Sequence, residues 1–376
     1  MCDSLCAIGP TGALFAKNSD RPSSEVQLIE TYAARLEGGR LRTTYVDIAD
    51  AGAFALVGAR PEWGWGLEHG VNAHRVAIGN EKIYTRLNPN KEPPGLTGMD
   101  LVRLGLERAR SADEGLDVMT SLLEEHGQGG VCDQTTGESY YSSFLICDAA
   151  SGWVLETSGR SWAAKSVPDR AAISNRITIR ADWTRASADV TPGDDWDERR
   201  HPRAPTEHAD VRLAASNACL ANAANLTPAD LAKHLRDHGD GSNVSVCMHL
   251  RGFQNTTSSI IAKLPADPGR PVRAWLAPGQ PCISIYVPVF PPHAVPSALS
   301  GAVTWRTFET LRDWRETDDE ALPRIRELFD PLEADLWAEA DAIAAQPDKH
   351  AVFVADAWRQ VWDAAQRLTS VRSGSR

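Results

Sequence analysis

Long hydrophobic runs are missing from this sequence, and so are dense runs of basic residues. A membrane-spanning helix needs roughly 18 or more consecutive apolar residues. No stretch approaches that length, so we expect no membrane partner. The chain has 39 basic and 50 acidic residues and a formal net charge of −11. Since no basic cluster is dense enough to follow a phosphate backbone, the sequence argues against nucleic acid as a partner.

A disulfide framework is also missing. The chain has seven cysteines, an odd number, and they are spread from Cys2 to Cys282. This spacing is unlike that of small secreted domains held together by disulfides. The first residues also lack the basic-then-apolar layout of a signal peptide. We therefore expect reduced thiols and a cytoplasmic protein.

What is present is enough apolar material for a sizeable core. Of the 376 residues, 42% are hydrophobic and 24% are charged, which is typical of a globular protein of one large or two ordinary domains. We predict a catalytic domain over 2–299, with a polar surface excursion or lid at 181–207. A helical extension over 300–376 follows, packed on the domain or at a homo-oligomer interface.

Short strand-like segments come in two groups, separated and followed by helical patterns. The predicted strands are 2–8, 13–17, 53–57, 75–79, 144–147, 153–157, 173–179, 244–248, 258–264, 273–277 and 283–287. The predicted helices are 99–110, 111–125 and one from Thr227 to Gly239, the last two with capping and stop signals. This order fits an α+β fold of two sheets with helices outside.

Cys2 is the first candidate for chemistry. It follows Met1 directly, and its small side chain permits removal of the initiator methionine. The freed α-amine has a pKa of roughly 7.7–8.0 and the thiol one of roughly 8.5, so a single residue supplies both base and nucleophile. Because cysteine also occurs at this position by chance, its surroundings must decide.

Those surroundings are polar. A tight turn at 9–12 folds Lys17, Asn18 and Asp20 back beside Cys2. There the Asp20 carboxylate can accept from the amine, and Lys17 can favour the thiolate. A solvated hairpin end is the alternative interpretation of the same residues.

A set of motifs resembles the secernin and dipeptidase A-type cysteine dipeptidases, within the N-terminal nucleophile (Ntn) hydrolases. The matching stretches include Cys2-Asp3, Phe15-Ala-Lys-Asn-Ser-Asp-Arg-Pro22, Trp63-Gly-Trp-Gly66, Ile78-Gly-Asn-Glu81, Trp153-Val-Leu-Glu-Thr157 and Ile173-Ser-Asn175. The resemblance runs in order from Cys2 to about Pro265. It implies a four-layer αββα sandwich with a helical C-terminal extension, and Cys2 as nucleophile after loss of Met1.

The resemblance also implies further catalytic residues. Choloylglycine hydrolases and penicillin V acylases, which are more distant relatives, have a basic residue, an asparagine and an aspartate after the same turn. The matching positions are Lys17, Asn18 and Asp20, of which we expect Lys17 and Asp20 to be catalytic and Asn18 to contact the substrate. Asn80 and Asn175 resemble the oxyanion-hole residues of that superfamily, although each also suits a turn.

Substrate contacts are predicted from the same motifs. Glu81 and Trp63 lie in matching stretches and are candidates for binding a free amine and for walling the pocket. The late arginine of choloylglycine hydrolases is not evident near 256–259. We predict that His249 or Arg251 fills that space.

Metal binding is not expected. Cys247 and His249 have the residue types of metal ligands, but no second pair at ligand spacing accompanies them. The predicted chemistry needs no cofactor.

The sequence therefore predicts a cysteine amidohydrolase that cleaves a linear amide or dipeptide bond through a Cys2 thioester. One alternative is an acyltransferase, in which an amine captures the same thioester. The other is a non-catalytic regulatory or binding protein of the secernin type.

Overall fold

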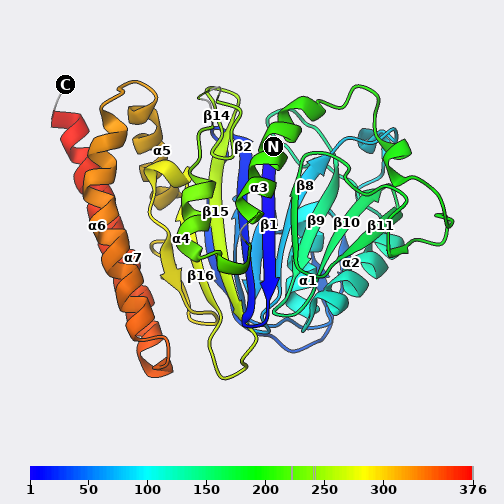
Figure 1. Ribbon diagram of the computed structural model, residues 1–376, viewed down its shortest axis with the longest axis horizontal. Coiled ribbons are helices and arrows are strands. Elements are labelled where there is room, and N and C mark those ends of the chain that lie inside the picture. Colours follow the sequence, from blue (N-terminus) through cyan, green and yellow to red (C-terminus); the bar gives the residue numbers. More distant parts are fainter. Residues whose placement is uncertain (222, 240, 242, 375–376) are drawn as a thin grey trace.

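The hairpin at the start of the chain lies in the middle of the first sheet. In the computed structural model, which describes residues 1–221, 223–239, 241 and 243–374, β1 (Cys2–Gly9) pairs with β2 (Gly12–Pro22), as the sequence predicts (Figure 1). The turn requires glycine at position 12, where φ is +121° and a Cβ would lie 2.1 Å from the Leu264 carbonyl oxygen.

Two large antiparallel sheets carry the fold. The first has the order β12-β1-β2-β15-β16-β17, with β14 paired to β15. Its remaining strands are β12 (Arg170–Ser174), β14 (His249–Leu250), β15 (Gln254–Pro265), β16 (Arg273–Pro278) and β17 (Val287–Val289). The second sheet has the order β13-β11-β10-β9-β8-β7-β6-β3. Its strands are β3 (Gln27–Tyr32), β6 (Leu56–Pro61), β7 (His69–Asn72), β8 (Ala77–Ile83), β9 (Tyr141–Cys147), β10 (Gly152–Ser158), β11 (Ser161–Val167) and β13 (Arg185–Ala186).

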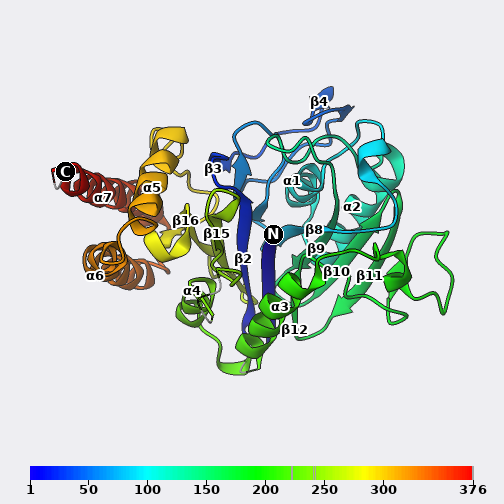
Figure 2. The same cartoon turned by 90° about the horizontal axis from the view of Figure 1, so that it is seen from above.

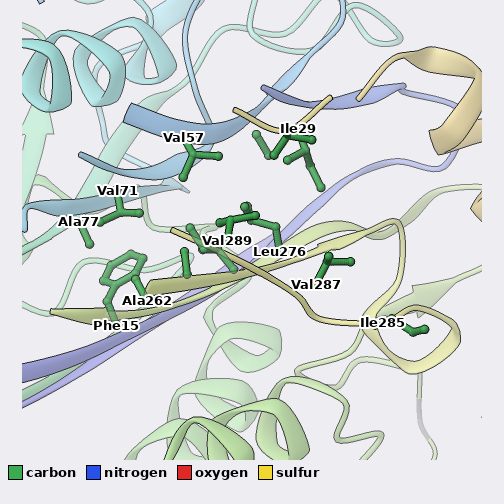
Figure 3. Close-up of a cluster of buried hydrophobic side chains, with 14 of the residues drawn as sticks. Phe15, Ile29, Val57, Val71, Ala77, Ala262, Leu276, Ile285, Val287 and Val289 are labelled. Carbon is green, nitrogen blue, oxygen red and sulfur yellow. The ribbon is translucent and has the colours of Figure 1, made fainter. Parts of the chain in front are cut away.

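The inner faces of the two sheets share one apolar core. Phe15 and Ala262 of the first sheet point toward Val71 and Ala77 of the second (Figure 3). These side chains are fully buried. Burial of a side chain as large as Phe15 contributes roughly 1.5–3 kcal/mol, so this layer holds the two sheets together.

Helices cover the outer faces of both sheets (Figure 2). On the second sheet lie α1 (Gly98–Arg108) and α2 (Ala112–His126), and on the first lie α3 (Thr206–Leu220) and α4 (Pro228–Leu235). Thr97 and Thr227 cap α1 and α4 in capping boxes, and Ser111 caps α2. These caps confirm the predicted helix starts near 99, 111 and 227. None of the described helices is long and apolar enough to cross a bilayer.

Three helices follow at the edge of the first sheet (Figure 1). They are α5 (Ala302–Arg315), α6 (Ala321–Ala342) and α7 (Pro347–Gly374). Phe308, Phe329 and Trp358 of these helices belong to the same buried cluster as Val287 of β17. The helical extension therefore shares its core with the sheets.

Short elements complete the chain. They are the strand pair β4 (Arg40–Arg42) and β5 (Asp47–Ala49), and the 3-10 turns η1 (Pro89–Lys91), η2 (Trp196–Arg199), η3 (Ala223–Asn225) and η4 (Pro281–Ile283). The predicted excursion at 181–207 contains only β13, η2 and the first residues of α3.

Several predictions about elements are wrong. The predicted strand 283–287 begins in η4, and β17 starts only at Val287, while the strand predicted over 173–179 ends at Ser174. The apolar segment 244–248 is not a strand, because the Asn18 amide binds the Val246 carbonyl and the Cys247 N–H donates to the Asp237 carbonyl. Helix α3 is not predicted at all. Pro205 at its N-cap offers no side-chain hydrogen bond, and its buried face carries Arg212 and Ser216 in place of apolar residues.

Candidate active site

Cys2 begins β1 and lies between two neighbouring strands of the first sheet. It stands opposite Ser19 of β2, and its side chain is buried. The Cys2 Sγ accepts a hydrogen bond from the Asp20 backbone N–H at 3.4 Å. A rigid strand therefore fixes the thiol, and a backbone dipole points at it.

Asn175 follows β12, the strand on the other side of β1. Its Oδ1 accepts from the Cys2 backbone nitrogen at 2.5 Å, and its Nδ2 donates to the Lys82 carbonyl at 2.9 Å. Both ends of this amide are engaged. The contacts are those of a residue that orients the Cys2 nitrogen, and they differ from the predicted donation to an oxyanion.

Arg212 of α3 joins these residues from outside the sheet. Its guanidinium is fully buried and donates to Asp3 Oδ2 at 2.6 Å, the Cys2 carbonyl at 3.2 Å and Asn175 Oδ1 at 2.9 Å. It also lies 3.4 Å from Asp20 Oδ2. One planar group with several donors thus fixes three polar side chains around Cys2.

Asp20 turns its carboxylate away from the thiol. Its Oδ1 accepts from the Thr256 hydroxyl at 2.6 Å, and its Oδ2 faces Arg212. Burial raises the Asp20 pKa to about 6, although the N-terminal ammonium, Arg212 and Thr256 each lower it. The Asp20 backbone carbonyl accepts from the Met1 amine at 3.1 Å, whereas the Cys2 nitrogen, the predicted partner of the Asp20 carboxylate, donates to Asn175.

Lys17 lies fully buried between the two sheets. Its Nζ is 3.7 Å from Glu81 Oε1. Burial opposes the Lys17 charge, but Cys2, Glu81 and other acids outweigh it and raise the Lys17 pKa. Burial in turn raises the Cys2 thiol pKa, and Lys17 is the largest influence that lowers it. The Lys17 charge thus opposes the effect of burial on the Cys2 thiol pKa.

A small cavity of about 30 Å³ opens beside Cys2. It is lined by Met1, Cys2, Asp20, Arg21, Glu68, Asn80, Lys82, Asp133, Glu138, Tyr140 and Gln254. Asn80 is thus beside the nucleophile as predicted, and its buried Oδ1 has no hydrogen-bond partner among the described residues. Most of the lining is charged or polar, and both signs of charge are present.

Met1 is one wall of this cavity. Its amine donates to the Asp20 carbonyl and, at 2.9 Å, to Gln254 Oε1. Burial lowers the pKa of this amine. Loss of Met1 would leave the Cys2 nitrogen beside Asn175 and enlarge the cavity.

Three predicted substrate contacts lie elsewhere. Asn18 points to the outer face of the sheet, where its Nδ2 binds the Leu235 and Val246 carbonyls and its Oδ1 accepts from Ser259. Successive strand residues face opposite sides, so Asn18 and Lys17 diverge. Glu81 is buried below Lys17 and accepts from the Ser4 hydroxyl. Trp63 donates to Glu25 at 2.9 Å. None of the three lines the cavity at Cys2.

His249 and Arg251 are also wrongly predicted as substrate contacts. Both line a different cavity, beside α5. Arg251 is exposed and pairs with Glu316 at 3.4 Å, while His249 contacts Cys247 and Cys282. The arginine that contacts Cys2 is Arg212 instead.

Arg212 and most of the charged residues that line the cavity at Cys2 were not predicted from the sequence. A signal for Arg212 exists, because Ala209, Arg212, Ser216 and Leu220 recur at spacings of three and four and are the buried positions of α3. The lining residues Glu68, Lys82 and Asp133 come from separate loops and strands, and only the fold brings them together.

Comparison with known proteins agrees with the resemblance that the motifs carry. The sequence model of peptidase family C69 matches residues 59–190. The matched residues include Asn80 and Asn175 but not Cys2 or Lys17. The chain is a hydrolase of peptide and related amide bonds.

Solved structures of similar outline include three amide hydrolases. A mutant conjugated bile acid hydrolase from Clostridium perfringens has 11% identity and a TM-score of 0.47, over 73% of this chain and 88% of that one. Penicillin V acylase from Agrobacterium tumefaciens has 12% identity and a TM-score of 0.44, over 77% and 86%. An N-acylethanolamine-hydrolyzing acid amidase ortholog from Caenorhabditis elegans has 12% identity and a TM-score of 0.39, over 69% and 92%.

Proposed function

We propose that this protein is a cysteine dipeptidase whose nucleophile is the thiol of Cys2 after removal of Met1. The observation that carries the proposal is the surroundings of Cys2: a buried thiol near a buried lysine, with its backbone nitrogen held by Asn175. We propose further that the two sheets and their outer helices form the αββα sandwich of Ntn hydrolases. Seven free cysteines are in keeping with a reducing compartment such as the cytoplasm.

In the proposed reaction the freed α-amine of Cys2 accepts the thiol proton, and the sulfur attacks the carbonyl carbon. Asn80 donates to the oxygen of the tetrahedral intermediate. The α-ammonium then gives its proton to the leaving amine, and a thioester remains. Water, deprotonated by the same amine, cleaves the thioester and regenerates the thiol. Asn175 and Arg212 keep the amine in position throughout.

A short zwitterionic substrate suits the charged cavity better than a long acyl chain does. Tyr140 is the one aromatic residue among the lining residues. Asp133 Oδ1 accepts from the Thr135 and Thr136 backbone N–H groups, and its carboxylate, which has no ion-pair partner among the described residues, can also bind a substrate ammonium. Lys82, which also lines the cavity, can exchange its contact with Glu138 for a substrate carboxylate. A carboxylate for the substrate amine and an ammonium for the substrate carboxylate favour a dipeptide with free ends over an N-acyl amide.

The nucleophile is tested first. Intact-mass measurement of the native protein should find Met1 absent and a single adduct after brief treatment with a thiol-directed probe. Cys2→Ser should lose both the adduct and hydrolysis. Cys219 lies near the C-terminal end of α3, and Cys219→Ser should keep both. Retention of Met1 together with unchanged activity in Cys2→Ala would refute the mechanism and favour the non-catalytic alternative.

The substrate class is tested separately. Free dipeptides should be cleaved faster than the same dipeptides with an acetylated amine or an amidated carboxyl end. Asp133→Asn should raise KM for free dipeptides and narrow the difference from the acetylated ones. Equal kcat/KM for free and acetylated substrates would refute the dipeptide assignment while leaving the Cys2 mechanism standing.

A further inference from the structure

Four potential metal ligands lie close together at the end of α4, the start of β14 and η4. His238 follows α4, Cys247 and His249 flank the start of β14, and Cys282 lies in η4. One ligand atom from each lies within 4.8 Å of all the others. Three of these residues are buried, and His238 is half-buried.

The three distances from His249 Nε2 to the other ligand atoms are close to the edges of a tetrahedral zinc site. Zinc bonds of about 2.3 Å to sulfur and 2.0–2.1 Å to nitrogen give tetrahedron edges of about 3.3–3.8 Å. The His249 Nε2 lies 3.1 Å from His238 Nε2, 3.3 Å from Cys247 Sγ and 3.5 Å from Cys282 Sγ. The edges that the structure gives are therefore close to those that one shared ion requires.

Hydrogen bonds alone do not account for this convergence. The His249 Nε2 faces three polar atoms, two of which are sulfurs, yet a ring nitrogen carries at most one hydrogen. It faces a second ring nitrogen edge-on, with the two imidazole planes at 76°. A cation that takes the lone pairs of all four atoms satisfies each of them at once.

We propose that His238, Cys247, His249 and Cys282 bind a zinc ion. Two thiolates and two imidazoles are a donor set that zinc prefers, and four protein ligands make the closed coordination of a structural ion. The ion would join the end of α4 and the start of β14 to η4, whose Cys282 comes 33 residues after His249. None of the four ligands lines the cavity at Cys2, so this site is separate from the proposed active site.

Arg315 of α5 sets a condition on metal binding. Its Nη1 lies 3.0 Å from His249 Nδ1. When Nε2 binds an ion, Nδ1 carries the ring hydrogen and cannot accept from an arginine. Arg315 must then turn away within a cavity of about 300 Å³ that Glu316 and Asp319 also line. The buried Glu316 Oε1 has no hydrogen-bond partner among the described residues and is a ready acceptor.

The test uses the full chain with its thiols reduced. After removal of metal with a chelator and addition of zinc, we expect one tightly bound zinc per chain by elemental analysis, and cobalt should give the absorption of a tetrahedral thiolate site. His238→Gln and Cys282→Ser should each lower zinc affinity more than about 100-fold, because losing a ligand exceeds the roughly 10–100-fold cost of losing an outer-sphere partner. Arg315→Gln should raise affinity about 10-fold.

Cys219→Ser is the matched control, since it removes a thiol outside the cluster and should leave zinc affinity unchanged. Failure of the reduced wild-type chain to retain zinc overturns the proposal. So does equal affinity in wild type, His238→Gln and Cys282→Ser. A Cys247–Cys282 disulfide in freshly purified protein would identify the cluster as a redox pair instead. His238→Gln changes a half-buried residue and keeps the test valid if Cys282→Ser does not fold.

Discussion

At the scale of single residues, Arg212 connects the most groups around Cys2. We predict that Arg212→Lys lowers kcat about 100-fold with little change in KM, because a misplacement of about 1 Å of the reacting groups costs that much. Lysine keeps the charge but loses the planar fork that holds Asp3, Asn175 and the Cys2 carbonyl. Steady-state kinetics with a cleaved substrate measures the split between kcat and KM.

Removal of the Arg212 charge should also destabilise the fold. Arg212→Met leaves Asp3 and Asp20 buried without their cation, a change that costs about 3–5 kcal/mol. Arg176→Lys is the control, because Arg176 pairs with Asp210 of the same helix at the surface and such pairs contribute under about 1 kcal/mol. Urea unfolding measures the free energy of unfolding of both variants. An equal decrease in Arg212→Met and Arg176→Lys would contradict the role of Arg212 as the buried cation of Asp3 and Asp20.

Glu81 makes stability depend on pH. Burial raises its pKa to about 7, although Lys17 and Ser4 lower it. The folded chain therefore holds a proton that the unfolded chain, with an ordinary glutamate pKa of about 4.3, has lost. The free energy of unfolding should therefore fall as pH rises from about 4.3 to about 7. Above about pH 7, titration of Glu81 should change it no further. Glu81→Gln should flatten that slope in urea unfolding, and the exposed Glu62→Gln should not.

Residue identities near Cys2 were predictable to different degrees. Lys17, Asp20 and Asn80 follow from the hairpin and from motifs close to strands, so the sequence analysis brings them to the nucleophile. Asn18 was expected at the substrate with Lys17, but successive strand residues face opposite sides of the sheet, so its side chain points to Leu235 and Val246. Arg212 was unpredictable from motifs, because it approaches from a helix outside the matching stretches.

At the scale of elements, β8 passes so close to β2 that position 79 has no room for a side chain. A Cβ on Gly79 would lie 2.4 Å from Lys17 Cδ and 3.2 Å from Phe15 Cζ. Gly79→Ala should cost about 1–3 kcal/mol through overpacking. By displacing Lys17, it should also move Cys2 alkylation to higher pH. Gly301→Ala, where the structure leaves open space, should change neither quantity.

Elements with strong local signals were predicted well. The first hairpin, the capped helices α1, α2 and α4, and the strands around Ile146 and Leu155 all form near their expected positions. Elements whose signal is spread over the fold were not. Strands β3, β7 and β11 have polar residues on pairing positions, and their neighbours in the sheet decide their conformation.

At the scale of the whole molecule, the boundary near residue 300 separates strands from helices without dividing the core. Trp358 of α7 is buried in the same cluster as Phe15 of β2. We therefore predict a single cooperative unfolding transition, with circular dichroism and tryptophan fluorescence coincident. Trp358→Ala should lower stability by about 3–5 kcal/mol without splitting the transition.

Val352 of the same helix is 73% exposed, and Val352→Ala should leave the transition unchanged. Two separate transitions, one of them sensitive to Trp358→Ala and the other not, would mean that the C-terminal helices fold as an independent unit.

The position of Met1 in the folded chain bears on when Met1 can be removed. Its amine is held by Asp20 and Gln254 in the wall of the cavity, so the folded protein shields the bond that an aminopeptidase must cut. Trimming and folding then compete for the same residue. Under the proposed mechanism, a chain that loses Met1 before it folds would become active, whereas a chain that folds first would keep Met1 in the wall of the cavity. The active fraction would then record how fast the cell processes new chains.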